Sequence, residues 1–286
     1  MWKTPISASQ IPAGAKNITE RSAEMIKIYF QRYGLTFLIA ILTVLLLGAV
    51  SVNLLGYRYI RTDVGIKYFG KVDKIGYPTV GTLYYPDGSR GEVNLPKRVI
   101  TFEDGTVYTG EFSGLARHGK GVQTLPDGGT YSGDFTNDKM TGVGTYTRED
   151  GTGFSGNFLD GKKNGRGTHV YSDGSIYTGE FKNDKRTGKG TLKLPDGTIY
   201  DGYFENNLKQ GSGTIVYANG DTYVGDFSDD VKSGHGTYSW SVGTTYTGSF
   251  QNDLMHGSGK MYFPDGTVYT GEFKNGAPVS DRVDRQ

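Results

Sequence analysis

The sequence predicts an all-β fold: an elongated single sheet of antiparallel β-hairpins, preceded by one transmembrane α-helix. Three observations support this prediction. A pattern of aromatic-x-Gly-x-Phe returns every 23 residues, each copy is flanked by turn residues, and an uncharged run of 21 residues precedes the array. The pattern begins at Tyr108, Tyr131, Phe154, Tyr177, Tyr200, Tyr223, Tyr246 and Tyr269.

One repeat shows how the residues specify a hairpin. In Gly190–Phe204, two short runs flank a Pro-Asp-Gly turn at 195–197, where proline presets φ and glycine accepts a positive φ. Strand side chains alternate between faces, so Tyr200, Gly202 and Phe204 share one face with the glycines of the next strand. Because glycine has no Cβ, the rings are expected to lie over glycine backbone.

These units resemble the MORN repeat (membrane occupation and recognition nexus), in which the aromatic pattern is followed by a polar loop and a Gly-x-Gly element. That element follows seven of the eight units, from Gly119 and Gly121 to Gly257 and Gly259. The resemblance implies scaffolding at a membrane. In MORN-repeat families that contain enzymes, the activity lies in a separate domain, and this array runs almost to the C-terminus. We therefore expect no catalysis.

Residues 1–33 are predicted to be an N-terminal segment containing a short amphipathic helix over 18–33. Asn17 and Glu20 have the spacing of a capping box, and apolar residues follow at roughly helical intervals. Such a helix fits a membrane surface and a docking site for a protein partner equally well.

Residues 34–57 are predicted to form the transmembrane helix. The run 35–55 is uncharged and has the length needed to cross about 30 Å of hydrocarbon. The alternative is a cleaved secretory signal, because Ala49-Val-Ser51 has the small-x-small form of a cleavage site. Flanking charges do not assign the side of the membrane that holds the array. The residues predicted to anchor the chain are Leu35, Phe37, Leu45, Leu46 and Leu55.

Residues 58–100 are predicted to be a connector with a degenerate capping hairpin, 101–276 the eight repeats, and 277–286 a polar tail. The last repeat lacks a closing Gly-x-Gly strand, so its outer edge is predicted to capture a partner or a second copy of the chain. The alternative is that the tail folds back onto this edge. The residues predicted to make the contact are Val268, Tyr269, Thr270 and Phe273.

Motifs for cofactors and metals are weak. The chain has no cysteine, and its four histidines form no motif with acidic residues. The segment Gly114–Gly121 spaces glycine and lysine like a P-loop, but Gly121 stands where serine or threonine must hold magnesium. We expect no cofactor, no metal and no nucleic-acid partner.

Charge is distributed unevenly. Residues 1–100 carry 13 basic and 6 acidic residues (+7), and residues 101–286 carry 18 and 24 (−6). Loop residues are predicted to form a basic edge that could recognise an anionic lipid or an acidic protein, although solvated loops explain it equally well. These residues are Lys139, Lys162, Lys163, Lys185, Arg186, Lys209 and Lys232.

Two function classes follow. The favoured one is a membrane-anchored scaffold or adaptor that holds protein partners, or its own copies, at a membrane. The alternative is an accessory subunit that recognises lipid headgroups or a polysaccharide along the aromatic face. Exposed rings would favour a polysaccharide, and a basic face would favour lipid.

Overall fold

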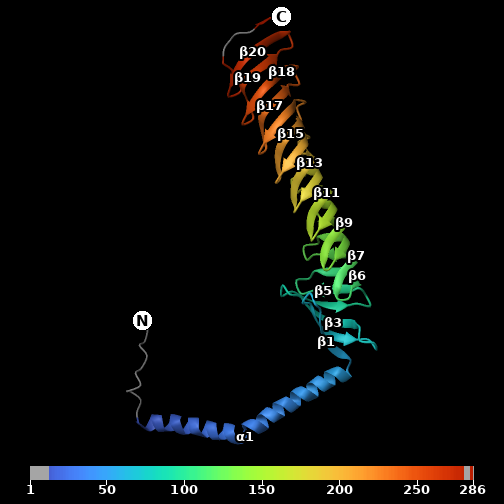
Figure 1. The fold of residues 1–286 in the computed structure, drawn as a ribbon, viewed down its shortest axis with the longest axis vertical. Coiled ribbons are helices and arrows are strands. Elements are labelled where there is room, and N and C mark those ends of the chain that lie inside the picture. The colour runs from blue at the N-terminus through green and yellow to red at the C-terminus, as the bar shows by residue number, and fades with distance from the viewer. Residues whose placement is uncertain (1–12, 280–283, 286) are drawn as a thin grey trace.

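The computed structural model describes residues 13–279 and 284–285, in which one long helix leads into an elongated stack of strands (Figure 1). Residues 1–12, in the predicted N-terminal segment, and 280–283 and 286, in the predicted tail, lie outside the described residues. The helix is α1 (Ala13–Leu54). The strands are β1 (Tyr57–Arg61), β2 (Lys67–Val72), β3 (Pro78–Tyr84), β4 (Arg90–Asn94), β5 (Val99–Phe102), β6 (Val107–Ser113), β7 (Ala116–Thr124), β8 (Thr130–Thr136), β9 (Lys139–Thr147), β10 (Gly153–Leu159), β11 (Lys162–Val170), β12 (Ile176–Lys182), β13 (Lys185–Lys193), β14 (Ile199–Glu205), β15 (Leu208–Val216), β16 (Thr222–Ser228), β17 (Val231–Ser239), β18 (Thr245–Gln251), β19 (Leu254–Tyr262), β20 (Thr267–Lys274), β21 (Ala277–Pro278) and β22 (Asp284–Arg285).

Helix α1 differs from the predicted transmembrane helix. It begins at Ala13, so the predicted short helix and the predicted span belong to one element. Among the described residues, no helix has the length and the apolar character needed to cross a membrane. This finding contradicts the predicted transmembrane helix and the single-pass localisation that rested on it. The predicted anchor residues Leu35, Phe37, Leu45, Leu46 and Leu55 belong to the run 35–55.

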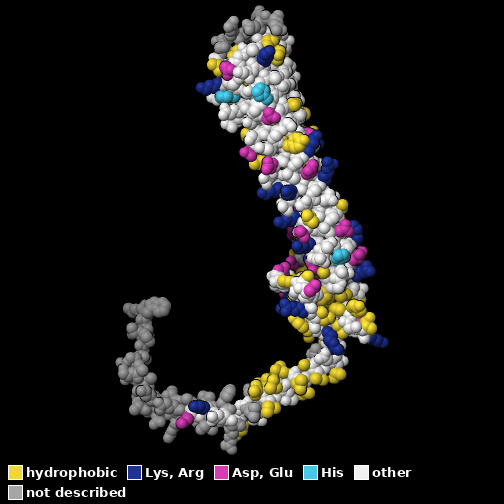
Figure 2. All heavy atoms as spheres, in the orientation of Figure 1, with side chains coloured by type: hydrophobic (Ala, Val, Ile, Leu, Met, Phe, Trp, Pro, Cys, Tyr) yellow, Lys and Arg dark blue, Asp and Glu magenta, His cyan; other side chains and the backbone are white. Residues whose placement is uncertain are grey.

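The run 35–55 lacks charge, but it is not uniformly apolar. Thr43, Ser51 and Asn53 interrupt the run with polar side chains. Each donates a hydrogen bond to the carbonyl oxygen four residues earlier, at 2.7, 2.8 and 3.1 Å respectively. Leucines and valines of the second half of α1 are nevertheless exposed, and Figure 2 shows hydrophobic side chains gathered there.

The sheet confirms the predicted array of antiparallel hairpins. From β1 to β20, each described strand pairs with the strand before it and the strand after it in sequence. Glycines face glycines across neighbouring strands, as Gly179 does with Gly190 and Gly190 with Gly202. A β-bulge follows Gly179, and bulges of this kind bend a strand and increase its twist.

Two kinds of turn join the strands of each repeat. The longer turn uses Pro-Asp-Gly: Gly197 has a φ of 94°, and the side chain of Asp196 accepts a hydrogen bond from the Thr198 N–H at 2.8 Å. The shorter turn has two residues, Asn183 and Asp184, with φ values of 49° and 69°, the pattern of a type I′ hairpin turn. Asparagine and aspartate tolerate this left-handed conformation better than most residues.

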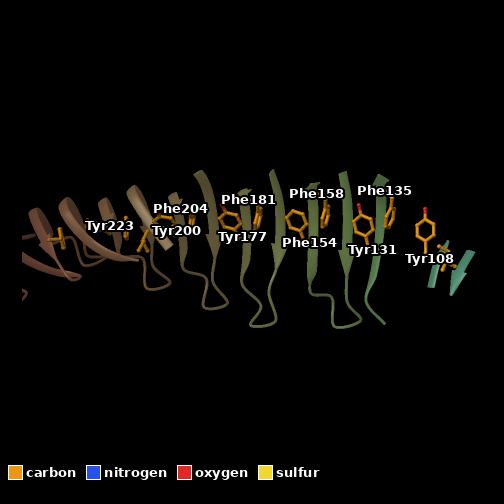
Figure 3. Packing of buried hydrophobic residues seen from close by; sticks show 14 of the residues in the cluster. Tyr108, Tyr131, Phe135, Phe154, Phe158, Tyr177, Phe181, Tyr200, Phe204 and Tyr223 are labelled. Carbon is orange, nitrogen blue, oxygen red and sulfur yellow. The ribbon is translucent and has the colours of Figure 1, made fainter. Parts of the chain in front are cut away.

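The core is a continuous ladder of aromatic rings along the array (Figure 3). The Tyr177 ring packs edge-to-face against Phe181 of its own repeat and Phe204 of the next, with centroids 5.1 Å apart in both cases. The hydroxyl of Tyr177 donates to the Glu180 carbonyl at 3.0 Å. A Cβ on Gly190 would lie 2.4 Å from that hydroxyl oxygen, so the ring occupies the space that glycine leaves. The ladder rings are core rather than surface.

Phe154 breaks this pattern because it has no hydroxyl to donate to the carbonyl three residues later. Phe154→Tyr should add the bond that Tyr177 makes and stabilise the protein by about 1 kcal/mol. The matched reverse change, Tyr177→Phe, should cost about the same. Urea denaturation measures both changes. A Phe154→Tyr variant that is less stable than the wild type would contradict the assigned role of the hydroxyl.

Candidate binding surface

A row of half-buried side chains covers the aromatic ladder. In each repeat, the second residue after the short turn lies opposite the phenylalanine of the preceding strand, as Arg186 lies opposite Phe181. Residues directly opposite on antiparallel strands point to the same face, so this row packs on the rings. We call it the ladder row; its members are Arg117, Met140, Lys163, Arg186, Lys209, Lys232 and Met255.

The cations of the ladder row stack on ring faces. The guanidinium of Arg186 lies 5.7 Å from the centroid of Tyr177 and 5.0 Å from that of Phe204. The ammonium of Lys209 lies 5.7 Å from the ring of Tyr200. Arg117, Arg186 and Lys209 each bridge the tyrosine of one repeat and the phenylalanine of the next. The ring quadrupole attracts the cation there, and its aliphatic stem covers apolar surface.

Half-buried aromatic residues flank the ladder row. Tyr217 and Tyr238 lie on either side of Lys232, whose ammonium is 5.0 Å from the Tyr238 centroid and donates to the Tyr217 hydroxyl at 3.3 Å. Trp240 continues this cluster, with its ring 4.6 Å from that of Tyr238. We call the ladder row and its flanking aromatics the ladder side. The aromatics are Tyr146, Tyr171, Tyr217, Tyr238 and Trp240.

The short turn of each repeat fixes the backbone of the row residue in the preceding repeat. The Asp184 carboxylate accepts a hydrogen bond from the Lys163 N–H at 2.9 Å, and the Asp184 N–H donates to the Lys163 carbonyl at 3.0 Å. Asp253 holds Lys232 in the same way, at 2.9 and 3.1 Å. The turn aspartates therefore serve the backbone first, and they hold the ladder row in place.

The predicted basic edge divides into two sets. Lys139, Lys162 and Lys185 are exposed, and the ammonium of Lys139 pairs with Asp160 at 3.2 Å. The other four predicted residues lie one strand position further along and therefore on the ladder side. They are Lys163, Arg186, Lys209 and Lys232. The sequence contained a signal that separates the two sets. Lys185 and Arg186 are neighbours in one strand, and successive strand side chains point to opposite faces.

The predicted contact residues at the last edge lie beneath the tail. Val268 pairs with Asp284 of β22, and Phe273 pairs with Pro278 of β21. The rings of Tyr269 and Phe273 are only 2% exposed, and they pack against each other as the last rings of the aromatic ladder. Thr270 lies on the same strand with an exposed side chain. The tail thus folds back onto this edge, the arrangement considered above as the alternative to an open edge.

The opposite face of the sheet carries hydroxyl groups that are already paired. Its hollows, of about 500 and 470 Å³, are floored by the glycine rows and lined mainly by serine and threonine, together with the cations Lys120, Arg166 and Lys189. Thr168 and Thr178 hydrogen-bond to each other at 3.0 Å, and Thr191 donates to Asp201 at 2.7 Å. These cross-strand pairs satisfy one another.

His169 is a half-buried titratable group of the ladder side. Burial lowers its pKa to about 4, and repulsion from Lys163, Arg148 and Arg186 adds to the effect. Lys163 itself has a lowered pKa, again chiefly because of burial. The positive groups therefore oppose one another at this point, and protonation of His169 is unfavourable in the folded protein.

We expect the protein to lose stability as the pH falls from 6.5 to about 4. In the unfolded chain, histidine takes up a proton near pH 6.5, whereas folded His169 does so only near pH 4. Stability is therefore full above pH 6.5 and falls below it, by about 1 kcal/mol between pH 7 and 5 after allowance for solvent screening. Urea midpoints at the two pH values measure it. His169→Gln should lack this component, and an unchanged pH dependence in that variant would contradict the assignment.

The fixed period, the single sheet and the ladder side define an elongated β-hairpin repeat protein. The MORN repeat family model matches eight units, at residues 108–130, 131–153, 154–176, 177–199, 200–222, 223–245, 246–268 and 269–279. The matches cover more than half of the chain, so the chain belongs to the MORN-repeat family. No curated protein matches it.

The solved structures that match include a TCP domain and a TCP10 domain. The SAS-4 (dCPAP) TCP domain of Drosophila melanogaster, in complex with a proline-rich motif of Ana2 (dSTIL), is 15% identical, with a TM-score of 0.35, over 64% of this chain and 93% of that chain. The wild-type TCP10 domain of Danio rerio CPAP is 15% identical, with a TM-score of 0.30, over 80% and 100%. Scores this low carry no functional inference.

Proposed function

We propose that the array is a protein-binding scaffold and that its ladder side holds an acidic segment of the partner. The observation that carries the proposal is the ladder row. It places half-buried cations on aromatic rings in five of the first six repeats, the exception being the repeat with Met140. Arginine, tyrosine and tryptophan are the residue types enriched where protein interfaces gain most of their binding energy.

The charge balance of the row favours an acidic partner. Arg117 pairs with Asp138 at 3.2 Å, and Lys209 lies 3.9 Å from Asp230. Within the part of the chain that the structure describes, Lys163, Arg186 and Lys232 form no ion pair. A half-buried cation without a counter-ion has lost hydration, and a carboxylate brought to it by a partner would compensate that loss.

The alternative functions receive less support. Recognition of a polysaccharide along the aromatic face requires exposed rings, and the ladder rings are buried. Residues 101–286 carry a net charge of −6 (18 basic, 24 acidic), which disfavours an anionic lipid surface. The proposed role is binding without catalysis, and it requires neither a cofactor nor self-association.

Selection of displayed peptides on the immobilised full-length chain tests the proposal. We expect the enriched sequences to combine aspartate or glutamate with apolar or aromatic residues. The ladder variant, Lys163→Gln with Arg186→Gln and Lys232→Gln, should no longer bind them. The edge variant, Lys139→Gln with Lys162→Gln and Lys185→Gln, is the matched control: it loses the same charge and should still bind.

A third variant separates loss of charge from loss of packing. Lys163→Arg with Arg186→Lys and Lys232→Arg keeps all three charges but changes how the cations stack on the rings. It should bind the selected peptides more tightly than the ladder variant does. Enrichment of neutral or basic peptides would overturn the proposal. Equal loss of binding in the ladder and edge variants would also overturn it, because the binding would then follow net charge alone.

A further inference from the structure

One cavity opens on the ladder side, between β9 and β12. Its volume is about 320 Å³, near the lower limit for a site that takes a small organic ligand. Met140, Tyr146 and Phe154 supply apolar walls, and Arg148, Lys163 and His169 supply nitrogen atoms. The aromatic ladder passes beside it, where Figure 3 shows Phe154 and Phe158.

The nitrogen atoms are arranged as donors. The Lys163 ammonium lies 3.4 Å from Nδ1 of His169, and because an ammonium can only donate, Nδ1 accepts and the ring proton lies on Nε2. The His169 ring is held by Tyr171, with centroids 4.0 Å apart. The Arg148 guanidinium lies 5.2 Å from the centroid of Tyr146, so it is fixed against the apolar wall.

The single carboxylate in the cavity lining does not neutralise these donors. Asp184 accepts the Lys163 backbone N–H at 2.9 Å, and no ion pair joins it to the Lys163 ammonium. Arg148 and Lys163 therefore leave an excess of positive charge in a space walled by apolar groups. Burial lowers the pKa of Lys163, the nearby Asp184 partly offsets this, and repulsion from Arg148 lowers the pKa further. A bound anion would act in the same direction as Asp184 and raise it.

We infer that this cavity binds a carboxylate carried on an apolar body, such as an acidic side chain beside an apolar one in the partner segment. Lys163 and Arg148 hold the carboxylate, His169 offers a further N–H, and Met140 and the rings contact the apolar part. The inference deepens the proposed function, and its biological role rests on that function. In the other repeats, the position of Phe154 holds tyrosine, and none of them has both a lysine at the position of Lys163 and a histidine at that of His169. The site therefore belongs to this one position in the array.

A titration followed by NMR tests the cavity directly. The chain has five methionines. Met140 lines the cavity. Met255 holds the equivalent position of the ladder row in a later repeat, away from the cavity. In the full chain with ¹³C-methyl methionine, Met140→Leu assigns the Met140 signal. Phenylacetate should shift that signal to saturation and leave Met255 unchanged. The neutral probe phenylacetamide should bind at least about tenfold more weakly.

Variants assign the effect to the lysine. Lys163→Gln should weaken phenylacetate binding about tenfold, whereas Lys162→Gln removes the neighbouring exposed cation outside the cavity and should leave binding unchanged. Unchanged Met255 and Met261 signals show that each variant is folded. Equal responses to phenylacetate and phenylacetamide, or equal losses in the two variants, would overturn the inference. So would phosphate binding as tight as phenylacetate binding, because the apolar walls would then have no role.

The two proposals fail separately. Phenylacetate binding without any selected acidic peptide would support the cavity and count against the scaffold. Selected peptides that bind without shifting the Met140 signal would support the scaffold and count against the cavity.

Discussion

Gly202→Val is expected to destabilise the array by about 3 kcal/mol, at the upper end of the usual cost of overpacking. A Cβ at this position would lie 2.4 Å from the Tyr200 hydroxyl oxygen and 2.7 Å from the Cα of Gly213. The first obstacle is a ring packed in the core, and the second is backbone, so neither can move cheaply. Urea denaturation of the full chain measures the loss.

Asp201→Val is the matched control for this change. Asp201 is the preceding residue, its side chain lies on the opposite face, and it is exposed. It accepts one hydrogen bond from Thr191 at 2.7 Å, so we expect a change within about 1 kcal/mol. If both valine variants lose the same stability, the effect belongs to valine in this strand and not to the space occupied by Tyr200.

Phe204→Ala should cost about 3–5 kcal/mol. Its ring is 3% exposed and packs edge-to-face against Tyr177 and Tyr200, with centroids 5.1 Å away in each case. Its loss leaves a cavity and breaks the ladder between two repeats. In an array where each repeat contacts only its neighbours, the damage should remain local.

Hydrogen exchange measured by mass spectrometry checks this locality. Amides of β12–β16 should lose protection, and amides of β6–β8 should keep it. Tyr203→Ala is the control, because its side chain is 49% exposed and points away from the ladder. Uniform loss of protection along the whole array would contradict nearest-neighbour stability.

The repeated elements could be predicted from the sequence because local chemistry specifies them. The 23-residue period, the Pro-Asp-Gly turns and the alternation of Tyr200, Gly202 and Phe204 are sufficient for the hairpins and the ring face. The structure adds that the rings fill the core. That result depends on how neighbouring hairpins bend together, and a single repeat does not contain it.

Features that depend on one position or on distant packing were missed. Lys162 and Lys163 are neighbours in sequence, yet one is exposed and the other lies on the ladder. The cavity beside His169 needs two adjoining repeats, so no single motif indicates it. The run 35–55 predicted a membrane span because it lacks charge, but no helix among the described residues has the length and apolar character to cross a membrane.

The affinity of one selected acidic peptide for the ladder and edge variants tests the central claim most directly. Fluorescence anisotropy gives Kd for each folded variant beside the wild type. Loss of three charge-assisted contacts should weaken binding to the ladder variant by at least about a hundredfold, while the edge variant should change by less than about threefold. Equal weakening in both variants, or greater weakening in the edge variant, would contradict the claim that the half-buried cations of the ladder side hold the partner.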